Sequence, residues 1–454
     1  MVWNRQNAGL VSTLALSLAL MSCAQENTQT APPAEAPVPV TETDTPAPQA
    51  ASFQPNTQAV TDLLESAVAE ERIAGGIVVI HQNGEEIYSR VVGMADREAE
   101  TPMSREDTLF QIYSMSKPVT GVALMTLYED GKFQLDDPLS KYIPGFEDMQ
   151  VFEGLDENGE PILVPAEREI TILDVLTHTA GFGYRVYAEP AEDDYLNGLY
   201  WTVYPLSDDK TLEQMASEVA DLPLYFQPGT QWQYSLAVDM QARLVEVLSG
   251  QSFHDYLQAS VLTPLGMDGT SRFLTQTEID QLAAGYSAAP EGGLVRMEDD
   301  MFYAYNNKEH PLEMGGAGLV MPIDDYVAFA QMLANGGSYK GVEILKPETV
   351  ELMATDHLDW PMDYVNTLGN EEDLGFGIDF AVRRKLAQSA EGLSGPLGEF
   401  YWDGFASTFF WVDPVNDMTA VMMVQKVPFD GALHKDFHDA VYAGTEYAAP
   451  TATE

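Results

Sequence analysis

Apolar runs with the spacing of β-strands stand near both ends of the chain. Near the amino end, residues 76–81 are followed by the turn sequence Asn83-Gly84 and a strand-like run at 86–91, which is the pattern of a β-hairpin. Near the carboxyl end, two further runs cover residues 407–412 and 418–427. An isolated hairpin is marginally stable at best in water, so each pair needs a partner. The sequence therefore predicts one antiparallel sheet assembled from both chain ends.

Segments with the apolar spacing of helices lie beside and between these strands. They cover residues 58–73, 118–128, 170–178, 212–222, 235–248, 253–262 and 436–442. Residues 136–169 are interrupted by Pro, Gly and acidic residues, and we expect loops there. The pattern predicts an α/β (α+β) fold, in which an antiparallel sheet is flanked by helices and a mostly helical lobe is inserted at about residues 136–275.

The amino terminus has the features of a secretory signal at residues 1–22: Arg5 precedes an apolar run that closes on Ser22-Cys23. Leu20 stands three residues before Cys23, which resembles the bacterial lipobox and implies cleavage before Cys23 and lipidation of its sulfur. An ordinary signal peptide with an incidental cysteine is the alternative. The lipobox interpretation makes the chain an exported bacterial lipoprotein at the periplasmic face of a cell membrane or in the cell envelope, held by its lipid anchor only.

Composition separates a tether from a folded domain. Residues 23–56 are rich in Pro, Ala and Thr, and we expect a disordered tether there. Residues 57–446 are long enough for one large domain, and residues 447–454 form a tail. The 22 basic and 71 acidic residues give a net charge of −49, which argues against nucleic acid as a partner. The acidic run at 156–160 has its glycine too early for an EF-hand loop, so we predict no metal and no cofactor.

A Ser-x-x-Lys sequence opens the helical segment that follows the first hairpin. Residues three apart lie on one helix face, so Ser114 and Lys117 are expected to point the same way while Ser116 points elsewhere. A serine hydroxyl becomes a nucleophile when a nearby base takes its proton, and a buried lysine is one such base. Pro118 fits only in the first helical turn. A second match at residues 207–210 has two aspartates beside its lysine, and we interpret Ser207 as a helix cap.

Three motifs in order resemble the serine β-lactamase/penicillin-binding superfamily. They are Ser-Met-Ser-Lys at 114–117, the Pro-Gly turn and tyrosine within 226–236, and Trp-Asp-Gly at 402–404. Residues 176–181 and 315–319 also look like family segments. The branch that contains class C β-lactamases and family VIII carboxylesterases fits best, and three motifs in order are far more specific than one.

The resemblance implies a set of catalytic roles. Ser114 is the nucleophile that forms an acyl-enzyme, and Lys117 and Tyr234 share the general-base and general-acid work. A phenol has a pKa near 10, so Tyr234 needs a neighbouring cation such as Lys117. Which of the two takes the first proton stays open. The resemblance also implies that the backbone N–H groups of Ser114 and Phe405 bind the oxyanion.

Two departures from the family pattern concern the substrate. In the β-lactamases and peptidases of this superfamily the third motif begins with a lysine that meets a substrate carboxylate, whereas this chain has Trp402 and then Asp403. The second motif usually ends in Asn, and here Leu236 takes that place. Gly404 keeps the close backbone approach that an oxyanion site needs. Arg383, Arg384 and Lys385 are the cations that could replace the missing lysine. The departures favour a small-molecule carboxylic ester as substrate.

Other functions remain as alternatives. A β-lactamase or D,D-peptidase is the first, and a non-catalytic binding lipoprotein is the second. A Ser-His-Asp hydrolase fits poorly, because no Gly-x-Ser-x-Gly sequence is present and His178 is expected to be structural. His434 and His438 stand four apart without the glutamate of a zinc motif, so we expect two surface histidines.

Overall fold

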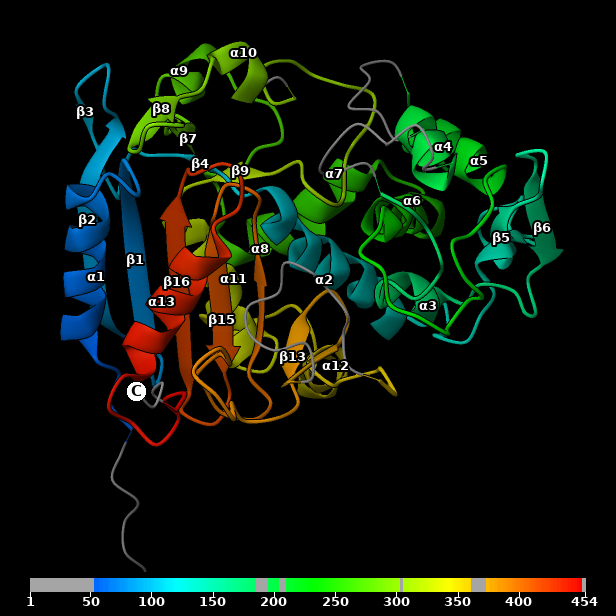
Figure 1. The fold of residues 1–454 in the computed structure, drawn as a ribbon. Helices are drawn as coiled ribbons and strands as arrows, with labels where there is room; N and C mark the ends of the chain where they lie inside the picture. Colours follow the sequence, from blue (N-terminus) through cyan, green and yellow to red (C-terminus); the bar gives the residue numbers. More distant parts are fainter. Residues whose placement is uncertain (1–52, 185–194, 204–209, 303–304, 361–372, 451–454) are drawn as a thin grey trace, which may run out of the picture. The chain divides into compact units, whose positions relative to one another are not determined.

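The computed structural model describes residues 53–184, 195–203, 210–302, 305–360 and 373–450 (Figure 1). The predicted signal peptide, Cys23 and the tether as far as residue 52 lie outside the described residues, so these predictions are untested. In the part of the chain that is described, no helix combines the length and the apolarity needed to cross a membrane.

One antiparallel eight-stranded sheet forms the core, with the strand order β12-β13-β14-β15-β16-β1-β2-β3. Its strands are β1 (Gly75–Gln82), β2 (Glu85–Asp96), β3 (Thr101–Pro102), β12 (Leu374–Phe376), β13 (Ala381–Arg383), β14 (Phe400–Asp403), β15 (Phe409–Asp413) and β16 (Met418–Val424). Strand β1 pairs with β16, and Val78 lies opposite Met422. The prediction that both chain ends build one sheet is therefore confirmed, and the fold class is as expected.

Helices cover both faces of this sheet (Figure 1). Successive residues of β15 point to opposite faces. Phe410 packs against Tyr326 of α11 (Ile323–Ala334), with ring centroids 4.8 Å apart. Trp411 packs against Phe437 of α13 (Gly431–Tyr442), with centroids 5.0 Å apart. Helix α1 (Thr57–Ala69) lies beside α13, so the two chain ends also meet on this face.

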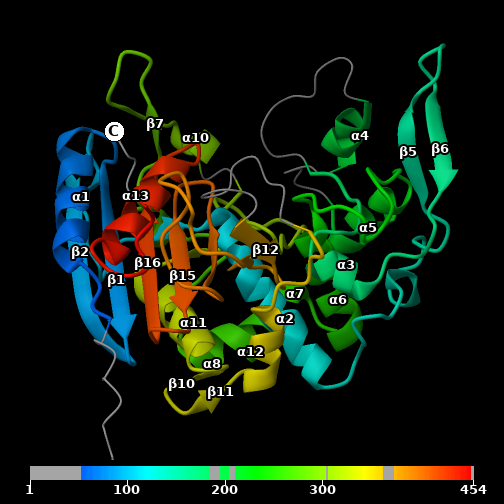
Figure 2. The same ribbon diagram turned by 60° about the horizontal axis from the view of Figure 1, so that its bottom comes forward.

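The inserted lobe is mostly helical, as predicted, and α2 (Ser116–Glu129) lies between it and the sheet (Figure 1). Its helices are α3 (Ile172–Leu176), α4 (Tyr195–Val203), α5 (Leu212–Ala220), α6 (Ala237–Ser249), α7 (Phe253–Leu257), a π-helical turn (Gln258–Leu262) and α8 (Thr263–Leu265). The lobe also contains a hairpin of β5 (Gln150–Leu155) and β6 (Pro161–Pro165), which stands clear of the helices in Figure 2. The expectation of loops at 136–169 is wrong there, because the acidic run at 156–160 supplies the tight turn of this hairpin.

Short elements complete the fold around this core. They are the pairs β4 (Phe110–Gln111) with β9 (Val320–Met321), β7 (Tyr286–Ala288) with β8 (Leu294–Arg296) and β10 (Ser338–Tyr339) with β11 (Val342–Glu343), the one-turn segments Tyr113–Met115 and Leu139–Lys141, and the helices α9 (Gln276–Ile279), α10 (Asp299–Phe302) and α12 (Pro347–Met353). Helix α5 begins after Thr211, whose side chain accepts a hydrogen bond from the N–H of Gln214. The cap is thus Thr211 and not Ser207, which lies outside the described residues.

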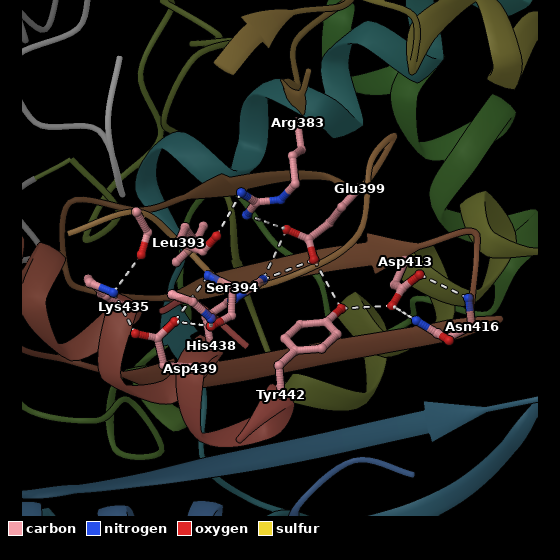
Figure 3. A network of polar contacts seen from close by, with 12 residues as sticks. Arg383, Leu393, Ser394, Glu399, Asp413, Asn416, Lys435, His438, Asp439 and Tyr442 are labelled. Carbon is pink, nitrogen blue, oxygen red and sulfur yellow. Dashed lines mark hydrogen bonds and ion pairs between the residues drawn. The ribbon is translucent and has the colours of Figure 1, made fainter. Parts of the chain in front are cut away.

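A buried polar network attaches α13 to the sheet (Figure 3). Glu399 lies 3.2 Å from the guanidinium of Arg383 and 3.0 Å from Nε2 of His438, and all three side chains are fully buried. The hydroxyl of Tyr442 lies 3.0 Å from Glu399 and 2.8 Å from Asp413. The prediction of surface histidines is therefore wrong. His438 belongs to this network, and His434 is buried with Nε2 2.8 Å from the carbonyl of Ser407.

Candidate active site

Ser114 lies in a single 3₁₀ turn, Tyr113–Met115, that leads directly into α2. Tyr113 has a φ of +44°, which is uncommon for a non-glycine residue and turns the chain sharply from β4 into this segment. The turn is held from several sides, because the N–H of Ile112 donates to Leu319 and the hydroxyl of Tyr326 donates to the carbonyl of Met115. Backbone strain at the residue before Ser114 is tolerated only where the surroundings fix it in this way.

The two serines of the first motif diverge, as the helical spacing predicts. Ser114 is partly exposed, whereas Ser116 is fully buried and accepts a hydrogen bond from the N–H of Leu319 at 3.2 Å. Pro118 is the third residue of α2, where no intrahelical donor is required of it. The local sequence thus presents one serine hydroxyl and one lysine on the same side of the segment.

Ser114, Lys117 and Tyr234 meet in space, although Tyr234 is 120 residues away in the chain. Lys117 Nζ lies 3.2 Å from Ser114 Oγ, and the hydroxyl of Tyr234 donates to the same oxygen at 2.8 Å. Lys117 Nζ is also 4.6 Å from the centre of the Tyr234 ring. The serine hydroxyl is therefore within hydrogen-bond reach of two groups that can carry its proton.

Lys117 is buried and has further polar neighbours. Its Nζ donates to the carbonyl of Gly316 at 2.8 Å and to the hydroxyl of Tyr184 at 3.4 Å. Burial lowers the pKa of Lys117 to about 8, against the opposing effect of Asp239, Asp379 and Asp403. A lysine with this pKa exchanges its proton near neutral pH, as a general base or acid requires.

Aromatic rings hold Tyr234 in place. The ring of His178 is 5.1 Å away, those of Tyr184 and Trp402 are 5.3 and 5.5 Å away, and that of Trp232 is stacked at 6.3 Å. His178 Nδ1 accepts a hydrogen bond from the N–H of Ser235, and burial holds the pKa of His178 well below its usual value. His178 is thus a neutral, buried residue beside Tyr234.

Trp402, Asp403 and Gly404 form the end of β14 and the residue after it. A Cβ on Gly404 would lie 2.4 Å from the carbonyl oxygen of Ile112, so only glycine allows this strand end to reach the segment before Ser114. Phe405 follows, and its ring contacts that of Tyr113 at 5.8 Å. The Asp403 side chain keeps some contact with solvent but is mostly buried. This burial raises its pKa to about 7, against the opposing effect of Lys117.

Leu236, Arg383 and Arg384, which the sequence also singled out, have structural partners. Leu236 is fully buried at the start of α6, and its N–H donates to Gly183. Arg383, proposed as a replacement for the missing lysine, is fully buried against Glu399 and donates to the carbonyl of Leu393 (Figure 3). Arg384 lies 3.5 Å from Asp356. Neither arginine is therefore placed to receive a substrate carboxylate.

Sequence reasoning missed three groups around Lys117: Tyr184, Asp239 and the carbonyl of Gly316. In the sequence, the glycines at 315 and 316 stand out only as part of a family-like segment. Asp239 stands in the first turn of α6, where an acidic residue is ordinary because it complements the helix dipole. Tyr184 follows two glycines in a segment without a periodic pattern. None of these signals separates a site residue from a structural one. In the described part of the chain, no cluster of three or more His, Cys, Asp or Glu side chains could hold a metal ion.

The fold and this arrangement of serine, lysine and tyrosine are those of a serine hydrolase with a β-lactamase-like architecture. A protein-family model described as "Beta-lactamase" matches residues 60–443, and the chain belongs to that family.

Among its relatives, esterase EstB of Burkholderia gladioli is 30% identical over 417 residues, which cover 87% of this chain and 96% of EstB. The structure of EstCE1, a hydrolase with promiscuous acyltransferase activity, is 28% identical with a TM-score of 0.69, covering 85% of this chain and 98% of EstCE1. Simvastatin synthase LovD of Aspergillus terreus has a TM-score of 0.72 at 22% identity, with 86% and 99% covered, and shows the shared fold. The chain is accordingly a serine hydrolase.

Proposed function

We propose that the protein is a carboxylesterase that forms an acyl-enzyme on Ser114. The observation that carries this proposal is the position of Ser114 Oγ, 3.2 Å from Lys117 Nζ and 2.8 Å from the Tyr234 hydroxyl. Similarity to esterase EstB supports the substrate class. The Trp-Asp-Gly form of the third motif supports it as well, because Trp402 carries no cation for the carboxylate of a β-lactam or peptide, and Arg383 is engaged by Glu399.

The proposed reaction has two halves. Ser114 Oγ attacks the ester carbonyl carbon while its proton passes to the Lys117–Tyr234 pair, and the carbonyl oxygen becomes an oxyanion near the N–H groups of Ser114 and Phe405. The tetrahedral intermediate collapses, the bond to the alcohol oxygen breaks, and the alcohol takes the proton. Water then attacks the acyl-enzyme, gives its proton to the same pair and releases the acid. Ser114 regains its proton, so the enzyme ends as it began.

The test compares a short-chain p-nitrophenyl ester with a chromogenic cephalosporin. We expect the wild type to hydrolyse the ester and to leave the cephalosporin largely intact, and Ser114→Ala to lose ester turnover. Ser207→Ala, in the other Ser-x-x-Lys sequence, is the matched control and should keep it. Dominant cephalosporin cleavage would favour the β-lactamase or D,D-peptidase alternative, and full turnover by Ser114→Ala would refute the proposed nucleophile.

We also propose that Cys23 carries a lipid that holds the domain at the periplasmic face of a bacterial membrane or in the envelope. Support comes from the sequence alone, through the apolar run that ends on Ser22-Cys23 and the Pro/Ala/Thr-rich segment after it. An anchor of this kind would leave the hydrolase domain free to meet small esters outside the cell membrane.

A further inference from the structure

We propose that Asp239 is a positioning residue for Lys117: its carboxylate holds the Gly315-Gly316 backbone against the lysine and supplies the negative charge that keeps the ammonium there. The inference rests on the proposed function for its catalytic meaning. Its structural basis is independent of which substrate the enzyme takes.

A continuous chain of hydrogen bonds connects Asp239 with Lys117. Oδ1 of Asp239 accepts the N–H of Gly315 at 3.0 Å and the N–H of Gly316 at 3.2 Å. The carbonyl of Gly316 in turn accepts from Lys117 Nζ at 2.8 Å. From α2, the hydroxyl of Thr120 donates to the carbonyl of Gly315 at 2.7 Å. One carboxylate on α6 thus places the backbone acceptor that fixes the lysine on α2.

The two glycines allow this backbone to lie between the helices. A Cβ on Gly315 would be 2.6 Å from the carbonyl oxygen of Val238 and 2.8 Å from Cβ of Ala242, so a larger residue would push the segment away from α6. A Cβ on Gly316 would lie 3.2 Å from Oδ2 of Asp239 and 3.3 Å from Lys117 Nζ. The carboxylate and the ammonium therefore face each other across Gly316, with no side chain between them.

Several titratable groups face Lys117 from different elements. Burial raises the pKa of Asp379, in the loop after β12, to about 8, and that of Asp403, on β14, to about 7, with Lys117 opposing both shifts. Tyr184 and Tyr234 face the lysine as well, and burial holds the pKa of His178 well below its usual value. Among the carboxylates that oppose the lowering of the Lys117 pKa, Asp239 has the largest effect.

Two consequences follow from this arrangement. With the charge of Asp239 in place, the protonated form of Lys117 is favoured against the burial that opposes it. With the two N–H bonds in place, Nζ stays at the Gly316 carbonyl and within 3.2 Å of Ser114. An asparagine at position 239 would keep the acceptor for both N–H groups and remove the charge. Asp239→Asn therefore separates the electrostatic part from the positional part.

The test measures the pKa of Lys117 directly, by ¹³C NMR of full-length protein labelled at the lysine ε-carbon, with the Lys117 signal assigned from Lys117→Arg. We expect Asp239→Asn to lower this pKa by about 1–2 units, as loss of an opposite charge at close range does. Thr120→Val, which loosens the same glycine segment without changing any charge, is the matched control and should leave the pKa in place. A pKa in Asp239→Asn within 0.3 units of wild type, or an equal shift in both variants, would overturn the proposal.

Ester kinetics on the same proteins complete the test. We expect the limb of the kcat/KM profile that belongs to Lys117 to move to lower pH in Asp239→Asn while KM changes little. Asp239→Ala, which loses both acceptor contacts, should lower kcat about tenfold or more beyond Asp239→Asn. Equal kcat values in Asp239→Ala and Asp239→Asn would refute the positional part. If the wild type lacks ester turnover, the proposed function fails, while the NMR comparison still decides whether Asp239 controls the charge of Lys117.

Discussion

Replacing Glu399 by glutamine should destabilise the fold far more than the similar size and shape of the two side chains suggest. Glu399 accepts hydrogen bonds from Arg383, His438 and Tyr442 in a fully buried setting (Figure 3). Burial opposes its ionisation, but His438 and Arg383 outweigh this effect and hold the pKa of Glu399 below its usual value. Glutamine fills the same space and leaves the Arg383 guanidinium buried without a counter-ion. Removing one partner of a buried ion pair costs about 3–5 kcal/mol.

Asp413, the second carboxyl group of this network, offers a matched control for Glu399→Gln. The Tyr442 oxygen is in hydrogen-bond contact with both Glu399 and Asp413, and its hydroxyl can donate to only one of them. Burial raises the pKa of Asp413, whereas the pKa of Glu399 is lowered, so of the two carboxyl groups Asp413 is the one that takes up a proton more readily. Asp413→Asn then mimics the protonated acid, once the side-chain amide of Asn416 turns over to accept, and should cost about 1 kcal/mol or less.

Differential scanning calorimetry measures the difference. For a domain of the length that the family model matches, an unfolding entropy of about 2.1 cal/mol/K per residue converts 3–5 kcal/mol into a Tm decrease of about 4–6 °C for Glu399→Gln. Asp413→Asn should lower Tm by about 1 °C. Because the folded pKa of Glu399 is lowered, its contribution is present above its ordinary pKa of 4.5 and is lost as pH falls through the folded value. A Tm decrease under about 1 °C for Glu399→Gln, or equal decreases for the two variants, would refute the assignment of charges.

Three further results are expected. Tyr234→Phe should lower kcat/KM for the ester about 10²–10⁴-fold with an unchanged Tm, because in the proposed reaction the phenol exchanges a proton with Ser114, and the ring packing remains; activity within fivefold of wild type would exclude that role. Gly404→Ala should lower kcat at least about tenfold, because its Cβ would lie 2.4 Å from the carbonyl of Ile112; unchanged steady-state kinetics would show that this contact does not position the serine. Cys23→Ala should move the protein from the membrane fraction to the soluble fraction of expressing cells, and an unchanged distribution on immunoblots would refute the lipid anchor.

The parts of the fold that sequence predicted well are those set by local periodicity. Alternation and the Asn83-Gly84 turn define the first hairpin, and the apolar runs at the other end are long enough to require pairing with it. The β5–β6 hairpin was missed because its strands carry Gly and Pro and its turn is acidic, so composition resembled a loop. His434 and His438 were expected on the surface because spacing alone does not reveal that Glu399, just before the distant β14, lies opposite one of them.

In the candidate site, too, the residues that local sequence predicts differ from those that only tertiary packing brings together. Ser114 and Lys117 were paired by helix geometry, which acts over three residues, and Tyr234 was added by its motif. Asp239, Tyr184 and the Gly316 carbonyl reach Lys117 from separate segments, and nothing in their local sequence marks them. Their role appears only when packing brings α2, α6 and the glycine segment together.

In the third motif, the residue that backbone geometry fixes and the residue that departs from the family pattern are different. Gly404 is fixed by backbone geometry, since any Cβ would meet the carbonyl of Ile112 and displace the segment that carries Ser114. Trp402, two positions earlier, is not constrained by this backbone contact, and its ring packs on that of Tyr234. The cation that a β-lactam carboxylate needs is thus exchanged for an aromatic ring, while Asp403 adds a carboxyl group close enough to act on Lys117. The motif retains the glycine that lies against the segment carrying Ser114 and lacks the cation of the family pattern, which supports the uncharged ester proposed as substrate.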